Sequence, residues 1–114
     1  MSKKFKSTHN LKFQIADKPH WPGSNSYAFK VGTVEGICRQ TPISFDILSV
    51  SNSAPGNGHL SDFFEWIFEI AKQGNAALRF FNVRERFGKV LTEYGFEAGD
   101  EPGQFFTLKY LVSK

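Results

Sequence analysis

Hydrophobic and polar residues alternate along the first half of the chain, and this spacing is typical of β-strands. Expected strands cover residues 10–16, 27–34, 36–39 and 43–50, the middle two being either one bent strand or two short ones. Residues 17–26, between the first two strands, are rich in turn-forming residues and predict a loop. The front half is therefore expected to form a sheet.

Residues 43–50 show the clearest alternation. Because successive side chains of a strand point to opposite faces, we expect two sets of side chains here. One face would carry Ile43, Phe45 and Ile47, and the other Ser44, Asp46, Leu48 and Val50.

The spacing changes after a glycine-containing loop at residues 51–58. A helix is expected next, and its apolar face would carry Leu60, Phe63, Phe64, Ile67, Phe68 and Ala71. Asp62 would point away from that face, and Gly74 would end the helix. A strand at 76–83, a helix at 84–94 closed by Gly95, and a strand at about 104–112 follow. This order predicts an α/β fold.

Composition places the chain among small globular proteins. It has 114 residues, 40% of them hydrophobic and 22% charged, which suits one domain covering residues 1–114. No apolar run approaches the roughly 20 residues needed to span a bilayer, and residues 1–12 lack the core of a secretory signal, so we expect a cytoplasmic protein without a membrane partner. The single Cys38 excludes an intramolecular disulfide and, with three His, argues against a metal site.

Positive charge is concentrated toward the N-terminus. Residues 1–57 hold seven Lys and Arg against three Asp and Glu, whereas residues 58–114 hold seven against eight. We interpret residues 1–9 as a flexible basic tail. Contact with a polyanion through the front lysines is the alternative, although a net charge of +3 does not favour nucleic-acid binding.

The segment from strand to glycine loop to helix is a candidate anion site. Backbone N–H groups and the positive end of a helix dipole meet there, Gly56 and Gly58 permit close approach, and His59 could add positive charge. The glycines could equally be turn residues. Neither a P-loop nor a dinucleotide fingerprint is present.

A longer pattern, from Leu48 to Phe96, resembles the GNAT superfamily of acyl-CoA N-acyltransferases. The matching features are a central strand ending at Val50, the loop Pro55-Gly56-Asn57-Gly58-His59-Leu60, the apolar helix closed by Gly74, the strand 77–83, the helix 84–94 and a terminal Gly95-Phe96. The resemblance implies a mostly antiparallel central sheet with two main helices packed on it. It also implies transfer of an acetyl group from acetyl-CoA to an amine. The cofactor-binding positions would be Val50, Gly56, Asn57, Gly58, His59, Leu60 and Asn82.

Three positions depart from the family pattern. Pro55 stands where the family has Arg or Gln, Leu60 where it has Gly or Ala, and Leu91 where many members have the Tyr that protonates the thiol. Pro has no N–H to offer a diphosphate. These departures favour the alternative, a catalytically inactive fold of this kind that acts as a protein-interaction or structural module.

A general base for the amine would be a carboxylate near the central strand. Asp46 is the first candidate and Glu35 the second, each with the alternative of a paired or solvated surface carboxylate. Tyr94 lies at an apolar helix position and is interpreted as a core residue.

The chain is short for the superfamily, because only the loop 17–26 separates the first two strands where many members have two helices. A protein partner or a second copy in a homodimer could supply the missing wall. In its short length and its departures from the motif, the chain resembles the reduced, diverged versions of this fold that occur among proteins of tailed phages.

Overall fold

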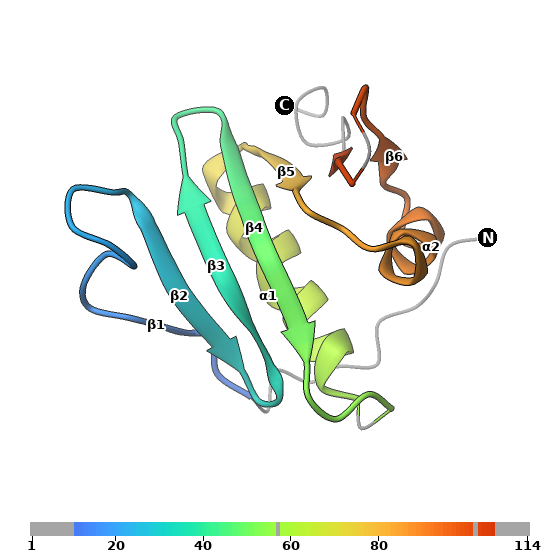
Figure 1. Cartoon of the computed structure of the whole chain (residues 1–114), viewed down its shortest axis with the longest axis horizontal. Helices are drawn as coiled ribbons and strands as arrows, with labels where there is room; N and C mark the ends of the chain where they lie inside the picture. The colour runs from blue at the N-terminus through green and yellow to red at the C-terminus, as the bar shows by residue number, and fades with distance from the viewer. Residues whose placement is uncertain (1–10, 57, 102, 107–114) are drawn as a thin grey trace.

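The computed structural model describes residues 11–56, 58–101 and 103–106. Its elements are β1 (Gln14–Ile15), β2 (Ser26–Val31), β3 (Val34–Gln40), β4 (Ser44–Asn52), α1 (His59–Gly74), β5 (Ala77–Phe80), α2 (Glu85–Glu93), β6 (Glu97–Ala98) and β7 (Phe105–Phe106). The strands form one sheet in the order β1-β2-β3-β4-β5-β7-β6 (Figure 1). Within the described residues β4 and β5 run parallel and the other neighbouring strands antiparallel. The predicted fold class, a mostly antiparallel sheet with two main helices, is confirmed.

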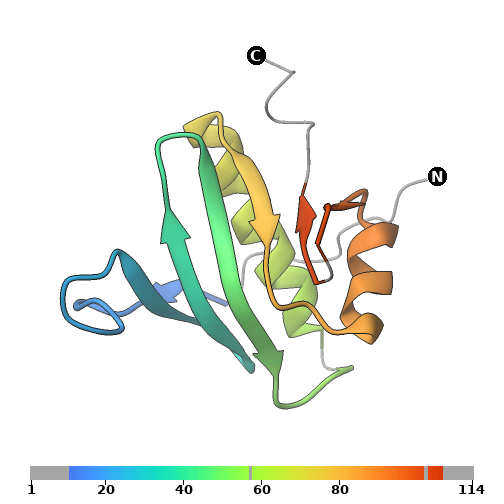
Figure 2. The same ribbon diagram turned by 45° about the horizontal axis from the view of Figure 1, so that its top comes forward.

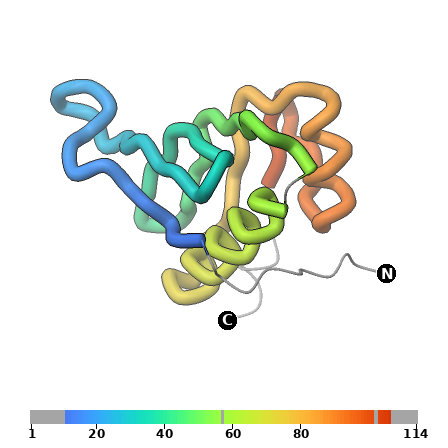
Figure 3. Tube along the Cα trace, turned by 90° about the horizontal axis from the view of Figure 1, so that it is seen from below, coloured from blue at the N-terminus to red at the C-terminus, as the bar shows by residue number. Residues whose placement is uncertain are grey.

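Helix α1 covers one face of the sheet. It contacts β2, β3, β4 and β5, and Figures 2 and 3 show it lying along one side of these strands. Helix α2 lies at the β6 end of the sheet. In the described part of the chain no helix lies over the opposite face of β2 to β5, which we call the open face. Successive residues of a strand point to opposite faces of the sheet, so the strand pairing shows which side chains belong to the open face.

The core lies between α1 and the sheet. The helix buries Phe63, Phe64, Ile67 and Ala71, as its apolar spacing predicts. They pack in one cluster with the buried strand residues Phe29, Val31, Val34, Cys38, Phe45, Ile47, Leu78 and Phe80. Burial of each large apolar side chain contributes roughly 1.5–3 kcal/mol, so this single cluster is the main source of stability.

Asp62 does not point away from this core, and that prediction was wrong. The residue is 7% exposed, and its Oδ2 accepts a hydrogen bond from the Leu11 backbone N–H at 3.2 Å. Trp66 Nε1 donates to the Leu11 carbonyl at 2.6 Å. Two α1 side chains thus bind both backbone groups of Leu11, which satisfies a segment that no strand pairs.

The first expected strand is shorter than predicted. Only Gln14 and Ile15 pair with β2, and Ile15 is 52% exposed, whereas Leu11 and Phe13 pack against the core. Ile15 therefore does not share the buried face of Leu11 and Phe13, and Leu11 is bound by α1 rather than by the sheet.

In β4 a bulge overturns the expected alternation. Cys38 pairs with Ile47 and Ile37 with Ser49, so Leu48 is an extra residue. Beyond it Val50, opposite Gly36, packs against the same core as Ile47 instead of sharing the face of Asp46. Ile43 precedes the strand and is 67% exposed, not part of the buried set.

Several element ends also differ. The break between β2 and β3 falls at residues 32–33, and Asn75, with φ 56°, rather than Gly74, takes the left-handed conformation after α1. The hairpin partner β6 was not expected. Of the predicted strand 104–112, residues 107–112 lie outside the described residues, as do the basic tail 1–9 and Asn57.

Candidate functional site

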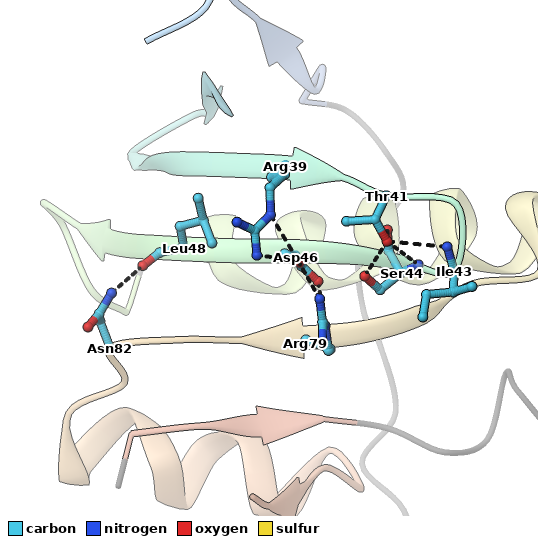
Figure 4. A network of polar contacts seen from close by, with 8 residues as sticks. All are labelled: Arg39, Thr41, Ile43, Ser44, Asp46, Leu48, Arg79 and Asn82. Carbon is cyan, nitrogen blue, oxygen red and sulfur yellow. Dashed lines mark hydrogen bonds and ion pairs between the residues drawn. The ribbon is translucent and has the colours of Figure 1, made fainter. Parts of the chain in front are cut away.

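The parallel strands β4 and β5 separate after a short paired stretch. Their pairing runs from Ser44–Ala77 to Ile47–Phe80, and Phe81 N–H still donates to the Ile47 carbonyl at 2.9 Å. At the next step a side chain takes over, because Asn82 Nδ2 donates to the Leu48 carbonyl at 2.9 Å (Figure 4). Asn82 itself has φ 59°, which turns the chain away toward α2. Residues 49–52 of β4 therefore run on without a β5 partner.

A cleft of about 480 Å³ lies beyond this separation. Its walls come from the end of β4, the loop that follows, the start of α1 and the first turns of α2. The lining residues are Val50, Ser51, Asn52, Pro55, Leu60, Arg84, Arg86, Phe87 and Val90. Apolar side chains from three elements thus meet two exposed arginines, which suits a ligand that is apolar at one part and anionic at another.

The start of α1 adds backbone donors near this cleft. Gly58 stands at the N-cap with φ 88°, and no side chain caps the helix. Gly58 itself offers no side chain to the N–H groups of the first turn, and the helix dipole places partial positive charge there. Gly56 has φ 92° and open space around its Cα. Both glycines adopt a left-handed backbone conformation, which is typical of turn residues. Because they have no side chain, the backbone of the loop stays accessible at these positions.

Two of the residues expected to bind cofactor, Val50 and Leu60, line the cleft. His59 does not line it. Its ring faces the turn between β2 and β3, where the Thr33 backbone N–H donates to Nδ1 at 3.0 Å. The ring of His59 is thus directed to Thr33 and away from the residues that line the cleft.

Asp46 lies on the open face and is 0% exposed. Arg39 donates to its Oδ2 from Nε at 3.1 Å and from Nη2 at 2.8 Å, and Arg79 donates from Nε to Oδ1 and from Nη2 to Oδ2, both at 2.8 Å (Figure 4). Burial raises the pKa of Asp46, but the hydrogen bonds from Arg79 and Arg39 outweigh it, and the net pKa lies below the ordinary value. A carboxylate held as an anion by two cations is poorly suited to accept a proton.

Glu35 is exposed on the same face, opposite Lys30 on one side and Ser51 on the other. With Ile37 and Ser49 it lines a shallow hollow of about 350 Å³. Asp46 instead lies opposite Arg39, several residues along the strands, so the two candidate bases are not brought together. Neither of them lines the cleft.

The helix residues singled out from the sequence lie in the core. The Tyr94 ring stacks on Phe64 with ring centroids 4.0 Å apart, which confirms its interpretation as a core residue. Leu91 is fully buried.

Sequence reasoning did not predict a binding role for four residues of the cleft, Arg84 at the N-cap of α2 and Arg86, Phe87 and Val90 within this helix. Phe87 and Val90 do share the helical spacing that predicts α2. The two arginines lie where this helix begins, Arg84 at its N-cap and Arg86 in its first turn. A search for cations at the start of the second helix would have found them.

No protein-family model matches the sequence, and no curated protein matches it significantly. Within residues 11–56, 58–101 and 103–106, neither helix has the length and apolar character needed to cross a membrane. Over the same residues no group of three or more His, Cys, Asp or Glu side chains is placed to hold a metal ion.

Proposed function

We propose that this chain binds an acyl-CoA, such as acetyl-CoA, in the cleft between β4 and α2 and transfers the acyl group to an amine. One observation carries the proposal. Where β4 and β5 separate, Val50 and Leu60, two positions implied by the GNAT resemblance, line one cleft together with Arg84 and Arg86. The proposal therefore rests on the same loop and strand end that the sequence pattern singles out.

Each part of an acyl-CoA finds a complementary surface there. The diphosphate suits the start of α1 and the two arginines, because both supply positive charge. The pantetheine arm carries two amides, and the edge of β4 beyond Ile47 has backbone groups that β5 does not pair. The arm could extend along this edge as an added strand. The thioester would then lie near the bulge at Leu48.

The transfer step needs few groups. The amine nitrogen attacks the thioester carbonyl carbon, a C–N bond forms, and the C–S bond breaks to release the coenzyme thiolate. The proton lost by the attacking nitrogen neutralises this thiolate, through solvent or directly. Positioning of the two reactants would supply most of the acceleration, so the reaction does not depend on Asp46 as a base.

A second candidate is an inactive fold of the same kind that works as an interaction module. The ion pairs of Asp46 favour it, because they occupy the best-placed carboxylate. The buried Leu91 also favours it, since no hydroxyl stands at that position to protonate a thiolate.

Thermal unfolding with millimolar acetyl-CoA or coenzyme A tests cofactor binding. A ligand that binds the native state alone raises the midpoint, by an amount equivalent to about 2.7 kcal/mol at a hundred times its Kd. We expect the rise to shrink in an Arg84→Gln, Arg86→Gln double variant and to persist in Lys72→Gln, which removes an exposed charge at the far end of α1. Cooperative melting with no rise in the unaltered protein would contradict the proposal.

Release of free thiol from acetyl-CoA in the presence of a panel of amines then separates the two candidates. Amine-dependent release would support transfer. Binding without release across the panel would favour the interaction module.

A further inference from the structure

The open face of the sheet carries a compact cluster of two cations around one anion. Arg39 of β3 and Arg79 of β5 both bind Asp46 of β4, so the cluster has one positive charge in excess (Figure 4). The carboxylate is fully buried, whereas the side chains of Arg39 and Arg79 are 32% and 39% exposed. The excess charge thus lies at the surface, above a buried counter-ion.

Asp46 occupies only one edge of each guanidinium. Both arginines bind it through Nε and Nη2. Within residues 11–56, 58–101 and 103–106 no hydrogen bond engages Nη1 of either arginine. Because Asp46 fixes both planar groups, their remaining donors are held in place before any ligand arrives, which lowers the entropy cost of binding.

An apolar surface lies beside these donors. The Phe81 ring centroid is 5.9 Å from Arg39 Cζ and 5.4 Å from Arg79 Cζ. Arg79, Phe81 and Phe106 also line a hollow of about 250 Å³, together with Gln104 and Asp100. A small molecule in this hollow would meet a guanidinium edge and aromatic faces together.

We propose that this hollow binds a small ligand through a single carboxylate, with an apolar group lying on Phe81 and Phe106. A carboxylate carries one negative charge and neutralises the excess of the cluster. A phosphate dianion fits less well, because the carboxylate of Asp100 lines the same hollow and opposes further negative charge. The hollow and the cleft share no lining residue, so the inference does not depend on acyl-CoA binding.

A purely structural role for the cluster would leave part of it unexplained. One arginine suffices to neutralise Asp46 and to join β4 to a neighbour. The second arginine leaves the cluster charged on a face that no helix covers in the described part of the chain. A bound anion accounts for that charge.

The test uses benzoate as the probe, added to the full chain at constant ionic strength kept with sodium chloride. We expect saturable shifts of the Arg39 and Arg79 Nε–H signals in ¹H–¹⁵N spectra, with those of Arg84 and Arg86 unmoved. Arg39→Gln should weaken binding by about tenfold, because it removes the excess positive charge of the cluster beside the hollow. Asp100→Asn should tighten it by about twofold or more, because a nearby like charge is lost.

Lys30→Gln is the matched variant, since Lys30 is an exposed cation on the same face that does not belong to the cluster. It should leave the benzoate affinity unchanged. The proposal is overturned if benzoate gives no saturable shift at Arg39 and Arg79, or if Lys30→Gln weakens binding as much as Arg39→Gln. Equal response to inorganic phosphate at the same ionic strength would also overturn it.

Discussion

Arg79 binds both carboxylate oxygens of Asp46 across the parallel pair of strands, at 2.8 Å from Nε to Oδ1 and 2.8 Å from Nη2 to Oδ2. The two residues are direct register partners of β4 and β5. Since Arg39 of β3 binds the same carboxylate, one buried group joins three consecutive strands. This junction lies one residue before the last paired position, Ile47–Phe80, so it fixes the sheet just before the two strands separate.

Replacement of Asp46 should therefore destabilise the sheet. Removal of one partner of a buried ion pair costs about 3–5 kcal/mol when the remaining charge stays buried. Here both arginines can reach water, so we expect Asp46→Asn to lower the free energy of unfolding by about 2 kcal/mol. Urea unfolding measures it. Glu35→Gln removes an exposed carboxylate from the same face and should change stability by less than about 0.5 kcal/mol.

Asp46→Asn should also change how the stability of the chain depends on pH in acid. Because the pKa of Asp46 is lowered in the folded chain, the unfolded chain binds a proton first as the pH falls. The stabilisation by Asp46 is complete above its ordinary pKa, about 4, and is lost as the pH falls through the lower folded value. In Asp46→Asn the free energy of unfolding should therefore fall less steeply as the pH is lowered through this range. An equally steep acid loss in the variant would contradict the assignment.

Two helix glycines should respond in opposite directions to the same change. A Cβ on Gly88 of α2 would come within 2.8 Å of the Phe105 ring, whereas a Cβ on Gly74 of α1 would meet nothing within 4 Å. We expect Gly88→Ala to destabilise by about 1–3 kcal/mol through overpacking and Gly74→Ala to stabilise by about 0.5–1 kcal/mol through helix propensity. Thermal unfolding of both variants measures the signs. Stabilisation by Gly88→Ala would show that α2 does not pack closely on β7.

The sequence pattern predicted what depends on local periodicity. The spacing correctly predicted that α1 buries Phe63, Phe64, Ile67 and Ala71, because side chains three or four residues apart share one helix face. Leu60 and Phe68, expected on the same face, are partly buried and pack against this core. Apart from β6, the order of strands and helices, and hence the fold class, follows from the same kind of signal.

What it missed depends on contacts between distant segments. The bulge at Leu48 is set by pairing with β3, and it reverses the faces of all later β4 residues, including Val50. Asp62 is buried where its carboxylate accepts a hydrogen bond from the backbone N–H of Leu11, which lies 51 residues away in the sequence. The arginines around Asp46 come from two other strands, so no local pattern indicates that this carboxylate is paired.

The thiol of Cys38 should be inert while the chain is folded. The residue is 1% exposed, and burial raises the pKa of its thiol to about 11. The thiolate is the reactive form, so a thiol-directed reagent at pH 8 should react much more slowly with the native chain than with the chain in urea. Equal rates in the two states would contradict this burial.

The last prediction concerns the loop of the cleft. Pro55 is exposed and lines the cleft at the position where the GNAT pattern has Arg or Gln. If the cleft binds the diphosphate of an acyl-CoA, Pro55→Arg should add a third cation to Arg84 and Arg86 and raise the affinity for coenzyme A by about three- to tenfold. Titration calorimetry at fixed salt measures the change. Pro22→Arg makes the same replacement at an exposed residue outside the cleft and should leave the affinity unaltered. An equal gain in both variants would mean that coenzyme A responds to net charge alone, and it would remove this loop from the proposed site.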